Sequence, residues 1–384
     1  MARFDPAQLL AETSQQTGLS DYGPEGFKEC LAVYCRALET DVQFDEEGAE
    51  RQRASIRDLL RRRLELYRDR AKYPEITQQK IKAPLIVIGL PRSGTTVLHA
   101  LLAQDPAARS PLAWEYGDLS PPPRTETYET DPRIAPAQAR ADAMPLAFKQ
   151  MHIAGAQLPE EDNSITTLAF QSANISAGLR MPTYLDWFMN ADYTPSYDVM
   201  EHVLQHLQAF CPREWWVLKS PGHTLHLDAL VKKFPDARLV WPHRDPASSI
   251  ISNSSLLGFV REMRSGQPVD KHELVEEMLY QWGDALWRAL AFRDQPGNEK
   301  YFVDVIYDDF VRDPMSQVRK IYSEFGMNLS VAAESAMRTF LENQPKDKHG
   351  AHRYTAEDYG LSAKELQKRF KPYIDRFNLR HELQ

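Results

Sequence analysis

The segment at residues 84–104, PLIVIGLPRSGTTVLHALLAQ, constrains the fold more than any other part of the chain. A short apolar run at residues 85–88 precedes a turn with glycine and proline and then a helical pattern, so a buried strand is predicted to lead into a helix N-terminus. Inward-facing N–H groups and the helix dipole favour phosphate-like anions at such a junction. The turn also carries side chains suited to an anion: Arg92, Ser93, Thr95 and Thr96.

The glycine spacing of this turn is close to that of a Walker A loop, with one difference. Gly89, Gly94 and Thr96 fit the pattern, but Thr95 stands where a lysine is required. Hydrolysis of a nucleoside triphosphate is therefore disfavoured. The hexapeptide PRSGTT at residues 91–96 instead resembles the 5′-phosphosulfate loop of sulfotransferases that use 3′-phosphoadenosine 5′-phosphosulfate (PAPS).

A second motif follows a later predicted strand, where the sequence reads HRDPASSIIS from residue 243. Arg244 at the strand end can bind a phosphate with two hydrogen bonds, and Ser252, two turns into the next helix, can add a hydroxyl. The arrangement resembles the 3′-phosphate motif of sulfotransferases. A helix-starting turn with Arg244 paired to Asp245 is the alternative interpretation.

Between these motifs lies the sequence LKSPGH at residues 218–223, at the end of another predicted strand. Parallel α/β sheets bind their ligands at this end of the strands. The resemblance to cytosolic sulfotransferases implies that Lys219 contacts the bridging oxygen of the phosphosulfate. It also implies that His223 accepts the proton of the acceptor hydroxyl, although the residues between the two differ from the family pattern.

Glu115 is the competing candidate for the general base. The tyrosylprotein sulfotransferases share the PRSGTT motif and use a Glu a little over twenty residues after the Arg of that motif. Glu115 lies at this distance from Arg92. We rank His223 first and keep Glu115 open. Further acidic candidates follow at residues 160–162.

Two more positions are implied by the resemblance to bind the donor. Tyr307 follows the last predicted strand, where sulfotransferases place a tyrosine against adenine, and an amphipathic ring suits that contact. Arg353 lies in a basic stretch that occupies the place of a 3′-phosphate loop. His202 and His206 are four residues apart on a predicted helix, but no third ligand accompanies them, so we predict no metal site.

Strands predicted at residues 85–88, 215–218, 237–241 and 301–306, with helices between them, indicate a parallel sheet. We therefore expect an α/β fold: a three-layer, P-loop-like sheet flanked by helices. Residues 1–80 are predicted to form an N-terminal helical layer packed on a main domain at 81–384. A helical insertion around residues 133–211 is expected to form a lid or acceptor wall.

Composition limits the possible partners. A net charge of −8 opposes bulk attraction to nucleic acid or anionic membrane. No apolar run approaches a membrane span, and Cys30, Cys35 and Cys211 form no disulfide framework, so a cytoplasmic protein is expected. An arginine-rich run at residues 51–70 is interpreted as a solvated charged face.

Together these features predict a PAPS-dependent sulfotransferase that releases 3′,5′-ADP. The acceptor is expected to be a small-molecule hydroxyl compound, either an apolar alcohol or a phenol. Two other classes stay open. One is a kinase-like P-loop phosphotransferase, and the other is a non-catalytic protein that binds 3′-phosphonucleotides.

Overall fold

The computed structural model describes residues 3–145, 154–343 and 355–383. It divides into two units. Unit 1 consists of residues 1–81, 111–140 and 160–212, and unit 2 consists of residues 82–110, 141–159 and 213–384. The predicted boundary near residue 80, and the packing of the N-terminal layer on a main domain, stay predictions.

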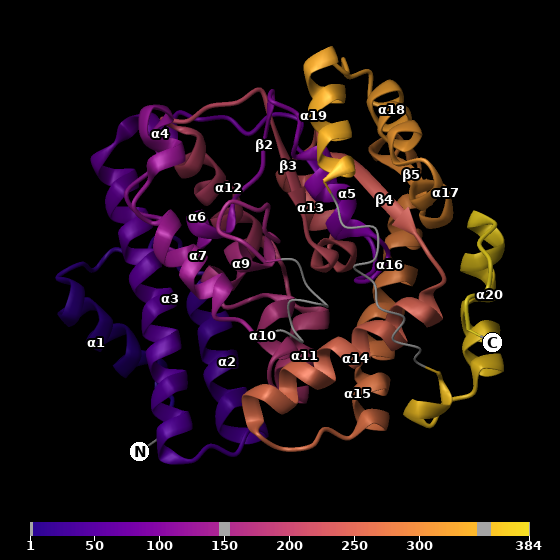
Figure 1. The fold of residues 1–384 in the computed structure, drawn as a ribbon. Helices are drawn as coiled ribbons and strands as arrows, with labels where there is room; N and C mark the ends of the chain where they lie inside the picture. The colour runs from indigo at the N-terminus through magenta and orange to yellow at the C-terminus, as the bar shows by residue number, and fades with distance from the viewer. Residues whose placement is uncertain (1–2, 146–153, 344–354, 384) are drawn as a thin grey trace. The chain divides into compact units, whose positions relative to one another are not determined.

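Unit 2 is built on a five-stranded parallel sheet with strand order β2-β3-β1-β4-β5 (Figure 1). Its strands are β1 (Leu85–Val87), β2 (Ala108–Arg109), β3 (Trp215–Lys219), β4 (Arg238–His243) and β5 (Phe302–Ile306). The central strand β1 is in register with β3 through Val87 and Lys219, and with β4 through Val87 and Val240. The carboxyl ends of these strands therefore meet at one edge of the sheet.

The sequence predicted four of these strands and missed β2. The four that were predicted are runs of largely apolar residues, as expected for strands covered on both faces. Strand β2 is only two residues long and pairs with one neighbour, β3, so it has too little pattern to detect. The predicted α/β class with a parallel sheet is confirmed.

Helices cover both faces of this sheet. A core cluster joins Val87 and Val217 of the strands to Leu98 of α5 (Thr95–Leu102) and Ile321 of α18 (Pro314–Glu324). The neighbouring helices are α17 (Tyr307–Arg312) and α19 (Val331–Glu342). The other helices of the unit are α13 (Leu227–Lys233), α14 (Pro246–Ser265), α15 (Lys271–Met278), α16 (Asp284–Arg293) and α20 (Ala363–Phe377), with short turns η3 (Pro221–Leu225), η5 (Glu299–Tyr301) and η6 (Glu357–Tyr359).

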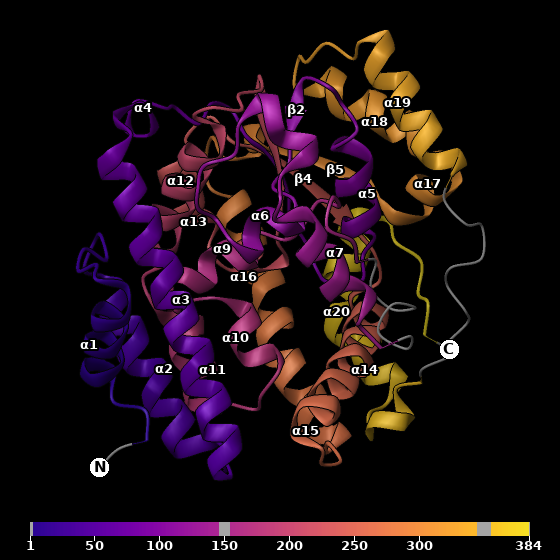
Figure 2. The ribbon, with the colours of Figure 1, turned by 60° about the vertical axis from the view of Figure 1, so that its left-hand side comes forward.

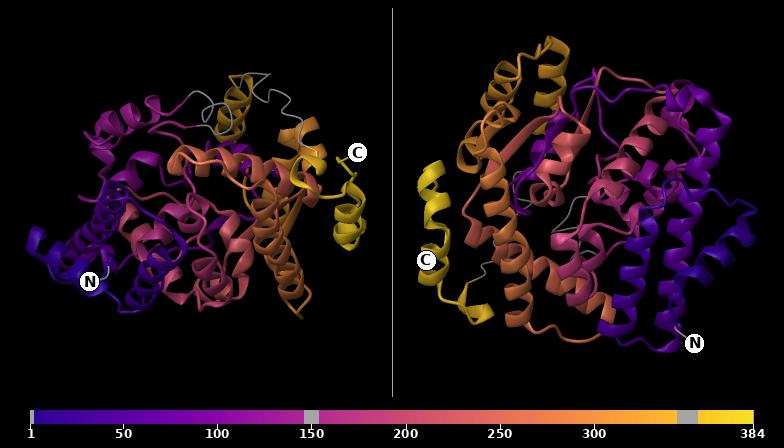
Figure 3. Two further views of the ribbon diagram at one scale, coloured as in Figure 1. Left: turned by 90° about the horizontal axis from the view of Figure 1, so that it is seen from below. Right: turned by 180° about the vertical axis from the view of Figure 1, so that it is seen from behind.

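The chain makes a π-helical turn, η4 (Leu279–Gly283), between α15 and α16. The C-terminal helix α20 packs on α14, and it lies beside the orange helices of this unit in Figure 3. Pro372 lies within α20, whose remaining residues still present an apolar face to the unit.

Unit 1 is helical. Its long helix α3 (Glu46–Lys72) packs against α1 (Pro6–Thr17), and α2 (Phe27–Asp41) packs against α11 (Pro182–Asn190) (Figure 2). Both α1 and α3 begin at an aspartate cap, since Asp5 accepts hydrogen bonds from two N–H groups of α1 and Asp45 accepts one from α3. The other helices and turns are α4 (Pro74–Thr77), α6 (Ala113–Gly117), η1 (Thr125–Thr130), α7 (Ile134–Asp142, which ends just outside the unit), α9 (Asn163–Thr166), η2 (Thr167–Ala169), α10 (Ala173–Ala177) and α12 (Thr194–Gln208).

The arginine-rich run of α3 is only partly a solvated charged face. Arg51 and Arg57 form ion pairs with glutamates of their own helix, as a solvated face would. Arg63 is instead 2% exposed, with its guanidinium 4.0 Å from the centre of the Phe27 ring and donating to the carbonyls of Tyr22 and Leu168. The interpretation was wrong for Arg63 because a guanidinium surrounded by carbonyls and aromatic rings can be buried.

Within the described part of the chain, every helix is too short or too polar to cross a lipid bilayer. The three cysteines are buried thiols rather than disulfides.

Candidate active site

The turn after β1 has a backbone that few residues can adopt. Gly89, Arg92 and Gly94 have φ values of 107°, 67° and 89°. A Cβ on Gly89 would lie 3.1 Å from the carbonyl oxygen of Pro242, so the strand packing itself requires glycine. Arg92 adopts the left-handed conformation despite its Cβ, and such strain, of order 1–3 kcal/mol, is concentrated at functional sites.

The hydroxyl-bearing residues of the turn differ in their surroundings. Ser93 is buried, and its hydroxyl donates to the carbonyl of Leu90 at 2.7 Å, which closes the turn. Thr95 is buried in the first turn of α5, while Thr96 is partly exposed. The N-terminal N–H groups of α5 follow Gly94, which caps the helix without a side chain.

Lys219 ends β3 beside this turn. Its side chain is 1% exposed, and its ammonium group donates to the hydroxyl of Thr96 at 3.4 Å. A buried ammonium group is costly unless polar or anionic groups surround it. The structure thus brings together Lys219 and the loop predicted to bind the phosphosulfate.

His223 lies in η3, the short turn that directly follows Lys219 and Ser220. The hydroxyl of Ser220 accepts a hydrogen bond from the N–H of Gly222 and so starts this turn. His223 is 1% exposed. The neighbouring Thr224 accepts a hydrogen bond from the N–H of Gly89 at 2.8 Å, which attaches the His223 turn to the turn after β1. Helix α16 packs against the same turn.

Arg244 and Ser252 converge on the same region. Arg244 follows β4, and its Nη1 donates to the carbonyl of Arg92 at 2.7 Å. Ser252 of α14 accepts a hydrogen bond from Nε of Arg92 at 3.3 Å. Asp245 caps α14 through the N–H of Ala247, and Arg244 is bound instead by the carboxylate of Glu382.

Tyr307 connects these parts. The guanidinium carbon of Arg244 lies 4.5 Å from the centre of the Tyr307 ring, a distance suited to a cation–π contact. A Cβ on Gly94 would lie 3.0 Å from the same ring, so the tight packing and the φ of 89° both favour glycine here. The ring therefore sits between the anion-binding turn and Arg244.

A buried histidine at β4 supports the position of Arg244. His243 lies 2.6 Å from the Tyr373 hydroxyl and 2.7 Å from the Asp304 carboxylate, and its ring stacks on Phe377. Burial lowers the pKa of His243, despite the opposing effect of Asp304. This network anchors α20 to β4, the strand that Arg244 directly follows.

Glu115 and the other acidic candidates belong to unit 1. Glu115 is fully buried in α6, and its carboxylate accepts a hydrogen bond from the N–H of Leu112 at 2.9 Å. Asp162 accepts one from the Tyr116 hydroxyl at 3.1 Å, and Glu161 one from the side chain of Asn163. Arg353 lies outside the described residues.

Two observations bear on metal binding. His206 is buried, which lowers its pKa to about 4, and one of its ring nitrogens lies 2.9 Å from the carbonyl oxygen of Leu119. Among the residues that the structure describes, no group of three or more His, Cys, Asp or Glu side chains is arranged to hold a metal ion.

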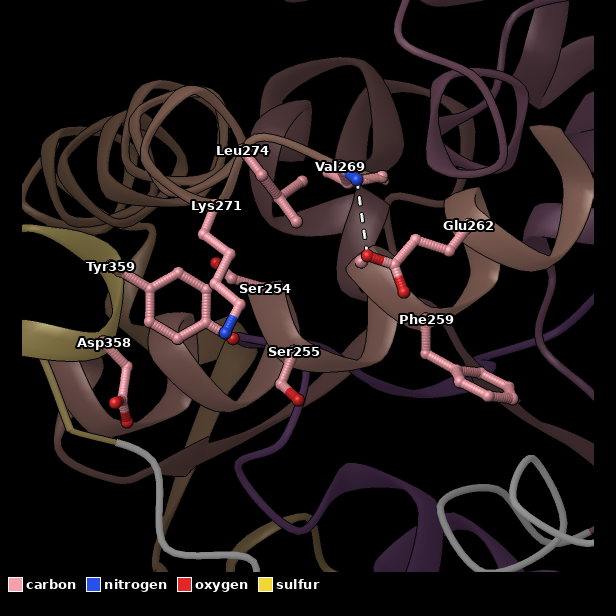
Figure 4. Close-up of a pocket in the computed structure, with 10 residues that line it drawn as sticks. Ser254, Ser255, Phe259, Glu262, Val269, Lys271, Leu274, Asp358 and Tyr359 are labelled. Atoms are coloured by element: carbon pink, nitrogen blue, oxygen red, sulfur yellow. Dashed lines mark hydrogen bonds between the residues drawn. The ribbon is translucent and has the colours of Figure 1, made fainter. Parts of the chain in front are cut away.

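A pocket of about 350 Å³ opens along α14, on the helix that carries Ser252 (Figure 4). Phe259 and Leu274 supply apolar lining, and Lys271 and Glu262 supply charge. Ser252, Ser255 and Phe259 recur every three or four residues, so they share one face of α14, and Phe259 lies about 10 Å along the helix from Ser252.

Residues 84–330 match the model of the sulfotransferase family. This chain belongs to that family. Its fold is similar to the crystal structure of sulfotransferase STF9 from Mycobacterium avium, with a TM-score of 0.90 and 31% identity over 99% of this chain and 98% of that one. It is also similar to STF1 from Mycobacterium tuberculosis H37Rv, with a TM-score of 0.81 and 30% identity over 95% of this chain and 98% of that one.

Among curated proteins, this sulfotransferase is 23% identical over 301 residues to the omega-hydroxy-beta-dihydromenaquinone-9 sulfotransferases Stf3 of Mycobacterium tuberculosis and Mycobacterium bovis. The match covers 77% of this chain and 74% of those proteins. The resemblance to the family on which the sequence interpretation depended is confirmed.

Sequence reasoning missed two residues of this sulfotransferase site. Thr224 directly follows His223, so its place in a motif-bearing turn was a usable signal. Glu382 is separated from Arg244 by more than a hundred residues, and no sequence pattern connects them.

Proposed function

We propose that this sulfotransferase moves a sulfuryl group from PAPS to a hydroxyl acceptor and releases 3′,5′-ADP. The observation that carries the proposal is the convergence of three cationic side chains, each at or after the carboxyl end of a different strand. Lys219 contacts Thr96, and Arg92 contacts Ser252. The carbonyl of Arg92 accepts a hydrogen bond from Arg244. A dianionic 3′-phosphate and a phosphosulfate together need such a set of cations.

In this proposal, the loop after β1 and the cations Arg92 and Lys219 stabilise the departing 5′-phosphate. The acceptor oxygen attacks sulfur in line, the new S–O bond forms, and the bond to the bridging oxygen breaks with its electron pair leaving on the 5′-phosphate. Arg92 and Lys219 stabilise that developing charge, together with the backbone N–H groups after Gly94 and the hydroxyls of the loop. Those hydroxyls belong to Ser93, Thr95 and Thr96.

The proton of the acceptor hydroxyl passes to His223, with Glu115 as the alternative base. His223 is favoured because its turn is attached to the anion-binding turn through Thr224 and Gly89. The carboxylate of Glu115 already accepts the Leu112 N–H of its own helix, a structural task.

Arg244 and Ser252 bind the 3′-phosphate in this proposal, and the Tyr307 ring packs against the nucleotide. Because the bridging oxygen leaves as part of a phosphate, the chain's own cations suffice in this proposal and no metal step is included. We also expect the protein to work in the cytoplasm, where its three thiols would stay reduced.

We propose that the acceptor is an apolar alcohol or phenol, with its apolar body in the pocket beside α14. Phe259, Leu274 and the Tyr359 ring suit an apolar body, and charged residues such as Lys271 and Glu262 suit a polar end. The name of Stf3 gives omega-hydroxy-beta-dihydromenaquinone-9, a hydroxylated compound, as that protein's acceptor, which favours an alcohol here.

A thermal-shift comparison tests the donor assignment. We expect 3′,5′-ADP to raise the melting temperature more than 5′-AMP or ATP with magnesium, and Arg244→Ala to remove most of that preference. A larger shift with ATP and magnesium would instead indicate the phosphotransferase class. Tight binding of 3′,5′-ADP without transfer of labelled sulfate from PAPS to any of a series of alcohols and phenols would indicate the non-catalytic class.

A further inference from the structure

The last described residues, 378–383, form a segment that we call the C-terminal strap. Asn378 ends α20 in the left-handed conformation, with a φ of 50°, and the strap then folds back along the unit. The side chain of Gln367 in α20 donates to the carbonyl of Leu383 at 2.8 Å, and Leu383 is buried. The strap therefore has a defined position beside α14 and α20.

The strap places a carboxylate on Arg244. Glu382 accepts hydrogen bonds from Nε and Nη2 of Arg244 at 2.8 and 2.6 Å, which is the two-point geometry that a phosphate would adopt. Its carboxylate also accepts from the hydroxyl of Ser248 at 3.2 Å. The N–H of Glu382 donates to Asp245 at 2.8 Å, so the backbone of the strap is fastened at the same place.

These contacts use the parts of Arg244 that a 3′-phosphate requires. The edge of the guanidinium that carries Nε and Nη2 donates to Glu382. Nη1, on the other edge, donates to the carbonyl of Arg92. Burial lowers the pKa of Arg244, but the hydrogen bonds to Glu382 and the nearby negative charges together raise it above its usual value, so Arg244 is charged. A phosphate with nearly two negative charges beside this carboxylate would be repelled.

We propose that the C-terminal strap is an internal competitor of the 3′-phosphate, and that Glu382 leaves Arg244 when the donor binds. The proposal rests on the proposed function, because it takes Arg244 as the 3′-phosphate ligand. It adds a reversible device that lowers the apparent affinity for PAPS and 3′,5′-ADP by the fraction of molecules in which the strap is closed.

The strap can open without unfolding its helix. Helix α20 is anchored independently through Tyr373 and Phe377, which contact His243. The strap itself depends on short polar contacts, such as the exposed ion pair between Arg380 and Asp308, and exposed pairs contribute little.

An alternative role for Glu382 is to orient Arg244 for the phosphate. The two roles predict opposite results. If Glu382 competes, removing its charge strengthens binding of a 3′-phosphate, whereas if it orients Arg244, the same change weakens binding.

The test is calorimetric binding of 3′,5′-ADP and 5′-AMP to the full chain and to Glu382→Gln. We expect Glu382→Gln to bind 3′,5′-ADP on the order of 10-fold more tightly and to leave 5′-AMP unchanged, since 5′-AMP lacks the competing phosphate. Glu365→Gln makes the same charge change at an exposed site on α20 and should match the parent.

Hydrogen exchange in the parent is the second measurement. Saturating 3′,5′-ADP should speed exchange of the Glu382 amide, which donates to Asp245, and leave the amides within α20 protected. Unchanged or slower exchange at Glu382 overturns the proposal.

The outcomes separate the two claims. If the parent prefers 3′,5′-ADP to 5′-AMP but Glu382→Gln binds it equally or more weakly, the strap is not a competitor and the proposed function stands. If neither protein prefers 3′,5′-ADP, the 3′-phosphate site is wrong, and the strap proposal is wrong with it.

Discussion

The backbone N–H of Gly89 donates a hydrogen bond to the hydroxyl of Thr224 at 2.8 Å, and both residues are buried. This bond connects the start of the turn after β1 to the turn that carries His223. Because Gly89 also packs against Pro242, the position of the loop depends on two neighbouring strands and on Thr224.

We expect Thr224→Val to lower the free energy of unfolding by about 1–3 kcal/mol, because an isosteric side chain without an acceptor leaves the buried Gly89 N–H unsatisfied. Urea denaturation measures this effect. Thr224→Ser keeps the acceptor and should retain most of the stability. A Thr224→Val protein as stable as the parent would show that the bond is not needed.

Lys219→Ala should lower kcat much more than it weakens PAPS binding. In the proposed function the ammonium group interacts most strongly with charge that develops on the bridging oxygen, so its removal affects the transition state more than the ground state. Steady-state kinetics with varied PAPS concentration separates the effect on kcat from the effect on PAPS binding. A change confined to KM would make Lys219 a binding residue and assign the catalytic charge to Arg92.

His223→Ala should lower kcat by about 10²- to 10⁴-fold, the usual contribution of a general base. Glu115→Gln is the matched variant for the competing base, because it removes the charge while keeping an oxygen that can accept the Leu112 N–H. We expect Glu115→Gln to lower kcat less than His223→Ala does. The assay needs an aliphatic alcohol as acceptor, because a phenol ionises by itself, and the reverse order of effects would assign the base to Glu115.

Phe259→Ala should raise KM for an apolar acceptor several-fold and leave binding of 3′,5′-ADP unchanged, because Phe259 lines the pocket beside α14 rather than the nucleotide motifs. Met263→Ala is the control, since Met263 is an exposed apolar residue on the same helix. Equal KM values for all three proteins would place the acceptor elsewhere.

Stability should fall as the pH decreases below about 6.5, in part because of His99. Burial, followed by the positive charge of Lys219, lowers the pKa of His99 from 6.5 to about 3. Between these values the unfolded chain binds a proton that the folded protein does not, so stability is complete above pH 6.5 and is lost toward pH 3. His99→Gln should reduce the slope of unfolding free energy against pH by up to one proton, about 1.4 kcal/mol per pH unit.

The sequence by itself determined the parallel sheet and the family. Strands covered on both faces are apolar runs, and the anion-binding turn needs glycine at set positions, so residues 84–104 predict both their local structure and their ligand class. The spacing of Arg244 and Ser252 is likewise a local pattern, because it spans a strand end and two turns of one helix. The cap at Asp5 is also a local signal, since it depends only on the next few residues.

Only the tertiary structure decided which distant residues contact these motifs. The burial of Arg63 depends on carbonyls of Tyr22 and Leu168, and the hydrogen bond from Gly89 to Thr224 joins residues 135 positions apart. The carboxylate of Glu382 reaches Arg244 from the chain terminus. Such pairs follow from how strands and helices pack rather than from any local periodicity, so a single sequence carries no pattern that predicts them.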